Sequence, residues 1–573
     1  MSIPPSAEYY NLGSYRRSIS GNEAANVWFN RGLVWCYAFN HAEAWRCFEQ
    51  AVLHDETCPM AHWGLAYAAG PNYNKPWRLF DAADLRHTMS TCHAAARQAH
   101  DLLLLLPSTS VTPVERALIL AMQKRFPPAR AGAGKAVEEE VDYPAIDAAY
   151  ADAMQAVYEE FGAQDLDVVA LYADARMFTH QRKMFDLKTG RPIESSPVYE
   201  VQELFNEALA REGGLEHPGL IHLSIHFWEM SATPAVALTA ADRLRNLVPD
   251  AGHLHHMPTH LDILIGDYRR SVDSNLAATI ADDKYLAHRG AKNMYSFYRM
   301  HDYHSLIYAA MLSGRYAVAV SAVDRMEVSL TDDVLRVTSP PLADWLEFFK
   351  SVRVHVYIRF GRWEEIKALP LPEDQELYCV TTAVTHYGKG IAYAATGDLV
   401  HADEERVKYH AAVQRVPASR MDYPNKMLDI FKVATAMLDG EIEYRRGEDY
   451  TAAFAHLRTA IEHDDALLYT EPWGWMVPTR HAYAALSLEQ GLVEQAAAAY
   501  AADLGLDPTI SRAHQHPNNV WALHGYYECL TKLGRHAEAQ IIKPQLDVAL
   551  RVADVEITSS CFCRLSCGAK LCK

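Results

Sequence analysis

Histidine is concentrated in one part of this sequence. Ten of the 28 histidines lie between residues 217 and 304, and the densest run, HLHHMPTH, covers residues 253–260. Neutral imidazole is the commonest metal ligand in proteins, and all-imidazole sites suit copper, zinc, iron or nickel better than magnesium or calcium. This part of the chain therefore indicates a transition-metal site.

Six of these histidines form three pairs, spaced four, four and three positions apart. The spacing of the first and third pairs places both rings of a pair on one side of a helix, and the second pair flanks a predicted helix start. We predict as metal ligands His222, His226, His256, His260, His301 and His304. The neighbouring His253 and His255 are predicted to be loop residues. A hydrogen-bonded structural network and a peptide-binding groove are the alternative interpretations of the cluster.

Two prolines set the geometry expected around these pairs. Pro218 suits the first position of a helix, where its missing N–H is not needed. Pro258 is expected to begin a second helix and to push Met257 towards an extended conformation. His256 then lies just outside that helix and His260 inside its first turn. The positive end of the helix dipole disfavours imidazolium there, which leaves both rings in the neutral form that binds metals.

The predicted ligand set indicates redox chemistry on a small molecule. A single zinc or iron ion held by three of the six histidines fits the sequence almost as well as two ions with three ligands each. The second arrangement leaves positions for dioxygen and is similar, by ligand count, to coupled dicopper oxidases. We therefore favour copper over iron or zinc and expect a metal-dependent oxidase or oxygenase that uses dioxygen, with its histidine-lined site in the groove formed by helical repeats.

Other residues are candidates for proton transfer and substrate binding. Glu229 follows His226 by three positions, so it can orient that ring or exchange a proton, and Tyr303 can act similarly. Asn72 and Asn74 lie in the turn-forming segment GPNYNKPW, and Arg480 follows two tryptophans in EPWGWMVPTRH. These three are the predicted substrate contacts. An inter-repeat turn and tryptophan packing are the structural alternatives.

The elements that carry these residues read as helices almost throughout. Ala, Leu and Glu recur with spacings of three and four, and signals of β-strands are scarce. Repeat positions 8, 11, 20, 24 and 27 of a tetratricopeptide repeat (TPR) are matched by Gly32, Trp35, Ala44, Phe48 and Ala51. Gly64 begins the next unit. Further helix-turn-helix units centre on Gly314, Gly447, Gly491 and Gly534. The sequence predicts an all-α, TPR-type α-solenoid of degenerate repeats.

A more specific resemblance extends over nearly the whole chain. The segments that carry it are, in order, FNHAEAWRCFEQA, AHWGLAYAAGPNYNKPW, HPGLIHLSIH, HLHHMPTH, HDYH, EPWGWMVPTRH and HPNNVWALHG. Together they resemble a family of bacterial and fungal TPR proteins. The resemblance implies an α-solenoid and leaves the activity open. The alternative to an enzyme is an interaction scaffold that binds an extended peptide or a protein partner in its concave groove.

Composition divides the chain into five parts. They are N-terminal repeats (1–125), an insertion loop with connecting helices (126–200), histidine-rich central repeats (201–330), C-terminal repeats (331–555) and a cysteine-rich tail (556–573). We expect exposed loops at Pro127–Pro144 and Asp186–Pro197. The tail is expected to be a disordered end whose four cysteines chelate a soft ion or remain free thiols.

Several classes of function are disfavoured. The net charge of -18 opposes nucleic-acid binding. No run of 18 apolar residues predicts a membrane span, and the N-terminus lacks a secretory apolar region, so we expect a cytoplasmic protein. Nucleotide-binding glycine motifs are missing, so no nucleotide cofactor is expected.

Overall fold

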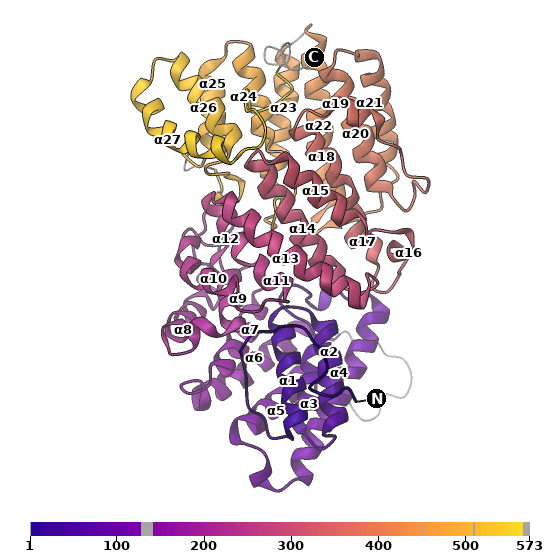
Figure 1. Cartoon of the computed structure of the whole chain (residues 1–573), viewed down its shortest axis with the longest axis vertical. Helices are drawn as coiled ribbons and strands as arrows, with labels where there is room; N and C mark the ends of the chain where they lie inside the picture. The colour runs from indigo at the N-terminus through magenta and orange to yellow at the C-terminus, as the bar shows by residue number, and fades with distance from the viewer. Residues whose placement is uncertain (1, 128–140, 449, 508–509, 565–573) are drawn as a thin grey trace. The chain divides into compact units, whose positions relative to one another are not determined.

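The computed structural model describes residues 2–127, 141–448, 450–507 and 510–564. The chain forms two compact units. Unit 1 comprises Met1–Pro258 and Ala277–Tyr295, and unit 2 comprises Thr259–Leu276 and Ser296–Lys573. Nearly all regular structure in both units is helical (Figure 1).

The helices up to α14 include all those that carry the histidine-rich segments. They are α1 (Glu23–Tyr37), α2 (His41–His54), α3 (Pro59–Ala69), α4 (Ala82–Leu105), α5 (Pro113–Arg125), α6 (Tyr143–Phe161), α7 (Leu166–Thr179), α8 (Val198–Ala210), α9 (Pro218–Trp228), α10 (Leu238–Leu244), α11 (Gly252–His256), α12 (Pro258–Ile265), α13 (Tyr268–Arg289) and α14 (Tyr295–Leu312). Short 3-10 turns are η1 (Trp77–Leu79), η2 (Ser108–Ser110), η3 (Gly214–Glu216) and η4 (Pro234–Ala237). The division between the units runs through α12, α13 and α14.

The remaining elements belong to unit 2. The helices are α15 (Tyr316–Glu327), α16 (Asp332–Leu335), α17 (Leu342–Leu346), α18 (Val352–Arg359), α19 (Trp363–Ala368), α20 (Cys379–Ala395), α21 (Leu399–Val413), α22 (Met427–Arg446), α23 (Tyr450–Asp465), α24 (Thr479–Glu489), α25 (Val493–Asp503), α26 (Val520–Lys532) and α27 (His536–Val552). Unit 2 also contains two 3-10 turns, η5 (Glu347–Ser351) and η6 (Arg512–His514), and one hairpin of β1 (Met421–Asp422) with β2 (Asn425–Lys426).

The first repeat packs as its residue pattern predicts. Helices α1 and α2 lie along each other, and α3 packs against both. The fully buried ring of Phe48 lies between Gly32 of α1 and Gly64 of α3, and a Cβ at Gly32 would come within 2.7–2.9 Å of it. Small residues at these positions therefore let one aromatic ring hold three helices together.

The later repeats end their first helices as expected. Gly314, Gly447, Gly491 and Gly534 all adopt positive φ, between 70° and 75°. The left-handed backbone stops one helix and turns the chain towards the next. The helix pairs that follow this pattern in unit 2 include α22 with α23, α24 with α25, and α26 with α27. The chain has the all-α, TPR-type solenoid fold that the sequence predicts.

One of the two expected loops is described by the structure. Residues 128–140 of the insertion lie outside the described residues. Residues 186–197 form a loop between α7 and α8, as expected, closed by a bridge between Phe185 and Pro192.

No described helix is long and apolar enough to cross a membrane.

The tail is not a disordered end where the structure describes it. Cys561 and Cys563 are buried and joined by a disulfide, whereas Cys567 and Cys572 lie outside the described residues. Ser560 is fully buried; its hydroxyl donates to the His481 carbonyl at 2.9 Å, and its own carbonyl accepts from Arg359. The sequence prediction failed because the contacts that order this segment join it to distant helices.

Candidate metal site and ligand pocket

Helix α9 carries the first predicted pair and begins as expected. Pro218 occupies its first position, and the His217 ring accepts a hydrogen bond from the backbone N–H of Leu220, so His217 caps the helix. His222 and His226 lie on one face with ring centroids 4.9 Å apart. His226 is in the last turn of α9.

His253 is the third member of this cluster, although the sequence predicted it to be a loop residue. It lies in α11, and its ring centroid is 5.2 Å from that of His222. Together, His222, His226 and His253 are called the histidine trio. One ring nitrogen from each member lies within 4.8 Å of the others. Their exposed fractions are 1%, 2% and 0%, so the trio is shielded from solvent.

The error about His253 has a local cause. Met257 has helical torsions, φ −49° and ψ −42°, rather than the extended conformation expected before Pro258. The residue before a proline is only biased away from the helical region, and here the chain stays helical. His255 is also helical, and its Nε2 lies 3.0 Å from the Pro249 carbonyl oxygen, a structural contact.

Two members of the trio are oriented through Nδ1. His222 Nδ1 lies 2.5 Å from the carbonyl oxygen of Tyr37, at the end of α1. His226 Nδ1 lies 2.9 Å from Glu229 Oε1, and Glu229 is itself only 1% exposed. An Nδ1–H that donates to a carbonyl or carboxylate leaves the Nε2 lone pair as the ligand atom, which is the usual arrangement around a bound metal.

The trio fits one ion after a small ring movement. Metal–nitrogen bonds of about 2.0–2.1 Å place the ligand nitrogens of one ion roughly 3.3–3.6 Å apart. Nitrogens within 4.8 Å of one another reach that separation when side-chain rotations bring them about 1 Å closer. The residues present therefore suit a three-imidazole site.

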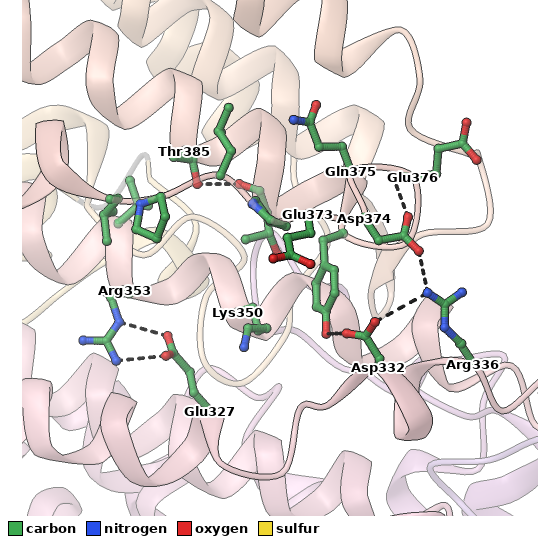
Figure 2. Close-up of a pocket in the computed structure, with 17 residues that line it drawn as sticks. Glu327, Asp332, Arg336, Lys350, Arg353, Glu373, Asp374, Gln375, Glu376 and Thr385 are labelled. Atoms are coloured by element: carbon green, nitrogen blue, oxygen red, sulfur yellow. Dashed lines mark hydrogen bonds and ion pairs between the residues drawn. The ribbon is translucent and has the colours of Figure 1, made fainter.

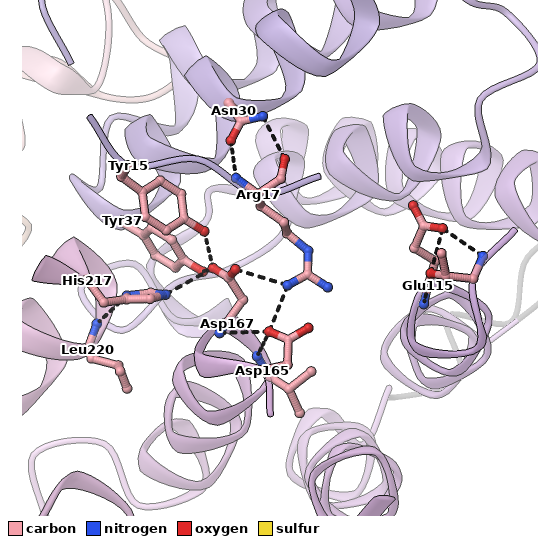
Figure 3. A network of polar contacts seen from close by, with 11 residues as sticks. Tyr15, Arg17, Asn30, Tyr37, Glu115, Asp165, Asp167, His217 and Leu220 are labelled. Atoms are coloured by element: carbon pink, nitrogen blue, oxygen red, sulfur yellow. Dashed lines mark hydrogen bonds and ion pairs between the residues drawn. The ribbon is translucent and has the colours of Figure 1, made fainter. Parts of the chain in front are cut away.

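A buried carboxylate, Asp167, joins several segments next to the trio, and Figure 3 shows its contacts with Tyr37, His217 and Arg17. Asp167 accepts hydrogen bonds from the Tyr37 hydroxyl at 2.5 Å, from His217 at 3.0 Å and from Arg17 at 2.9 Å. Burial raises the pKa of Asp167, but His217 and Arg17 outweigh it and hold that pKa well below its ordinary value. The backbone carbonyl of Tyr37 also accepts a hydrogen bond from His222. Asp167 of α7 is therefore connected through Tyr37 of α1 to His222 of α9.

The other four predicted ligands do not complete the trio within unit 1. His256 stacks on His253 at 5.6 Å. His260 and His301 belong to unit 2, where their rings meet edge to face at 5.6 Å. His304 lies edge-on against two phenylalanine rings at 5.8 and 5.3 Å, and burial lowers its pKa to about 3. Metal binding by these four stays a prediction.

The predicted substrate contacts have structural roles. Asn72 Oδ1 accepts from the backbone N–H groups of Asn74 and Lys75, which closes the turn. Arg480 forms a two-bond ion pair with Asp465 at 2.7 and 2.6 Å. These contacts are what the structural alternatives, a turn and a packed helix, require, and a substrate role for the three residues stays a prediction.

The two predicted proton-transfer residues lie in different units. Glu229 contacts His226 in unit 1, as the sequence suggested for an orienting partner. Tyr303, in unit 2, is fully buried on α14 with the guanidinium groups of Arg299 and Arg325 at 4.9 and 5.1 Å from its ring. Proton transfer by either residue stays a prediction.

Unit 2 contains a separate open pocket of about 960 Å³ between α15, α18, α20 and the segment 369–376 (Figure 2). Its arginines are neutralised within the pocket. Arg353 pairs with Glu327 at 2.9 Å, and Arg336 pairs with Asp374 at 2.5 Å. In the described chain no carboxylate pairs with Lys350, whose ammonium lies 5.7 Å from the centre of the Tyr378 ring.

The fold and the trio define the class: an all-α, TPR-type solenoid with a buried cluster of imidazoles. No family model matches the chain. No curated protein is significantly similar to it.

Solved structures with some likeness of fold include the APC/C hetero-tetramer Cut9–Hcn1 (13% identity, 92% of this chain and 76% of that chain covered, TM-score 0.29). Two others are Naa15/Naa10 bound to HypK (13%, 92% and 70%, TM-score 0.21) and the P58(IPK) TPR domain (12%, 82% and 99%, TM-score 0.19). Identities and scores this low do not indicate a shared function.

Four residues that matter at the site were not predicted: His253, Tyr37, Asp167 and Phe39, whose ring centroid lies 4.3 Å from that of His222. A signal existed for His253, which precedes His256 by three positions and so shares its helix face once the helix is known. The remaining three contact the site through the fold, from segments far away in the sequence.

Proposed function

We propose that unit 1 binds one transition-metal ion through the histidine trio, with copper favoured over iron or zinc. The observation that carries the proposal is the convergence of three buried imidazole nitrogens within 4.8 Å. The Nδ1 contacts of two of the rings, to Tyr37 and Glu229, support it because they fix the tautomer that a metal requires.

Elemental analysis tests the proposal. Protein expressed with copper, iron and zinc available should carry about one equivalent of metal, and His253→Gln should lose it while keeping its helical circular-dichroism signal. His255→Gln is the matched control: it changes a buried histidine of the same helix outside the trio, so its metal content should stay unchanged. Less than a tenth of an equivalent of metal in the unmodified protein would refute the proposal.

We further propose that the bound metal carries out redox chemistry, as predicted from the sequence. Copper held by imidazoles changes oxidation state, and dioxygen is its natural oxidant. The expected result is dioxygen consumption by copper-loaded protein in the presence of ascorbate, lost in His253→Gln. Equal consumption by the two proteins would contradict enzymatic use of the site.

An interaction scaffold is the second candidate function, and the TPR-type fold favours it. The pocket of unit 2 supports this role because its arginines are already paired, which leaves the ammonium of Lys350 without a carboxylate partner in the described chain. The carboxylates of Glu373 and Glu376 in the lining are likewise unpaired among the described residues, so an acidic ligand group has to lie beside Lys350 and away from these two. Val354, Leu369 and Leu371 add apolar surface. We propose that the pocket receives an extended peptide with one acidic side chain next to an apolar one.

Selection from a displayed random-peptide library tests the scaffold. The enriched peptides should share an acidic–apolar pair, and their affinity should fall at least tenfold in Lys350→Glu, which is a loss of about 1.4 kcal/mol. Lys389→Glu, which reverses a lysine of α20 that is not in the pocket lining, is the matched control. The scaffold proposal fails if no peptide is enriched, or if the enriched peptides bind Lys350→Glu equally well.

A further inference from the structure

Phe39 has an unusual backbone and lies against the whole trio. Its φ is +56°, and the other described non-glycine residues with positive φ, Arg182 and Asn518, are polar. Left-handed backbone is uncommon outside glycine, and it is least expected for a bulky apolar side chain. Where such a conformation persists, the surrounding structure holds it in place, and residues of this kind cluster at functional sites.

The ring of Phe39 contacts all three imidazoles. Its centroid lies 4.3 Å from that of His222, 5.7 Å from His226 and 5.8 Å from His253. The planes of the last two pairs are within 13° and 28° of parallel, so these imidazoles lie offset-stacked against the phenyl ring. One aromatic ring therefore limits the rotation of every member of the trio.

The left-handed turn is what brings the ring there. Phe39 lies just after α1, two residues beyond Tyr37, whose carbonyl accepts from His222. The same short segment thus orients one imidazole through its backbone and restrains all three through a side chain. With right-handed torsions at Phe39, the side chain would leave the backbone in a different direction.

A phenyl ring also affects which ion the trio can hold. It has no donor atom, and it keeps water from the side of the trio that it covers. Zinc takes four ligands in almost every structural site, whereas cuprous ion is stable with three. A three-imidazole site covered by an aromatic ring therefore suits the ion that needs no fourth ligand.

We infer that Phe39 is the positioning and specificity-determining residue of the site, and that it makes the trio selective for Cu⁺ over Zn²⁺. The inference rests on the proposed metal site. Phe39 binds no ion itself. It acts by holding the three rings convergent and by excluding a water that would complete a zinc site.

The test compares Cu⁺ and Zn²⁺ affinities, measured by chelator competition, in the full chain and two variants. Phe39→Leu removes the aromatic face, and Phe39→Asn removes the ring but keeps a residue that tolerates the left-handed backbone. Both should lower the ratio of Cu⁺ to Zn²⁺ affinity at least tenfold. Phe126→Leu, a buried phenylalanine of unit 1 outside the trio's contacts, is the control and should leave the ratio unchanged.

The outcomes separate the two proposals. An unmodified chain that binds neither ion overturns the metal site itself. An unmodified chain that binds Cu⁺, with the same selectivity in both Phe39 variants, keeps the metal site and overturns the role of Phe39. Phe39→Asn also decides the matter if Phe39→Leu does not fold. In Phe39→Asn loaded with Co²⁺, the absorption spectrum should gain the signature of an added water ligand. An unchanged spectrum overturns the inference.

Discussion

Replacing Gly32 by alanine tests whether the Phe48 ring holds the first repeat together. The new Cβ would lie 2.7–2.9 Å from three atoms of that ring, which is fully buried. Overpacking of this kind costs about 1–3 kcal/mol. Alanine recovers about 1 kcal/mol of helix propensity relative to glycine. We expect Gly32→Ala to destabilise this repeat by about 1 kcal/mol.

A second substitution separates the two contributions. Phe48→Leu removes the ring atoms that the new Cβ would meet, so Gly32→Ala should stabilise the repeat by about 1 kcal/mol in that background. The double-mutant cycle should therefore give a coupling free energy of about 2 kcal/mol between the two positions.

Hydrogen exchange by mass spectrometry on peptides from residues 23–54 is the assay, because it reports local opening of α1 and α2. A coupling of 2 kcal/mol corresponds to a change of roughly 30-fold in exchange rate. A coupling below about 0.3 kcal/mol, or stabilisation by Gly32→Ala alone, would refute the packing of Phe48 between the repeats.

Two further predictions concern unit 2. Burial lowers the pKa of His355 to about 4, below the value of about 6.5 in an unfolded chain, so the unfolded state binds the proton first as pH falls. Lowering pH from 7 to 5 should therefore cost about 2 kcal/mol of stability, and guanidinium unfolding of His355→Leu should lack this part of the pH dependence. If His355→Leu keeps the pH dependence of the unmodified protein, His355 is not a neutral buried ring in the folded state. Asp503→Asn should destabilise the unit by about 3–5 kcal/mol, because Asp503 is the fully buried partner of His481 and His516. A loss below 1 kcal/mol in thermal unfolding would show that the charge is not needed.

The repeat fold was predictable because its signals are local. Gly32 and Phe48 specify one helix pair through size alone, and Gly314 or Gly534 ends a helix through its own backbone. The pairing of His222 with His226 was predictable for the same reason, since both lie on one helix.

The rest of the site depends on contacts between distant segments. His222 meets the Tyr37 carbonyl 185 positions away, and no spacing rule reveals that contact. The place of His253 in a helix depended on whether Met257 stays helical, and packing decides that conformation. The positive φ of Phe39 has no sequence signature, because the chain around it, rather than its own preference, imposes that conformation.

The segment 553–564, which is buried at Ser559, Ser560 and Cys561, has a consequence for how unit 2 folds during synthesis. Asp554 accepts from the backbone N–H groups at the start of α15, 238 positions earlier in the chain, and the Ser560 carbonyl accepts from Arg359, 201 positions earlier. At roughly 5–20 residues per second, α15 leaves the ribosome on the order of 10–50 s before its partner exists. During that time the surface that later receives this segment is uncovered. An uncovered surface of this kind makes the nascent chain more prone to aggregation until the closing contacts are made.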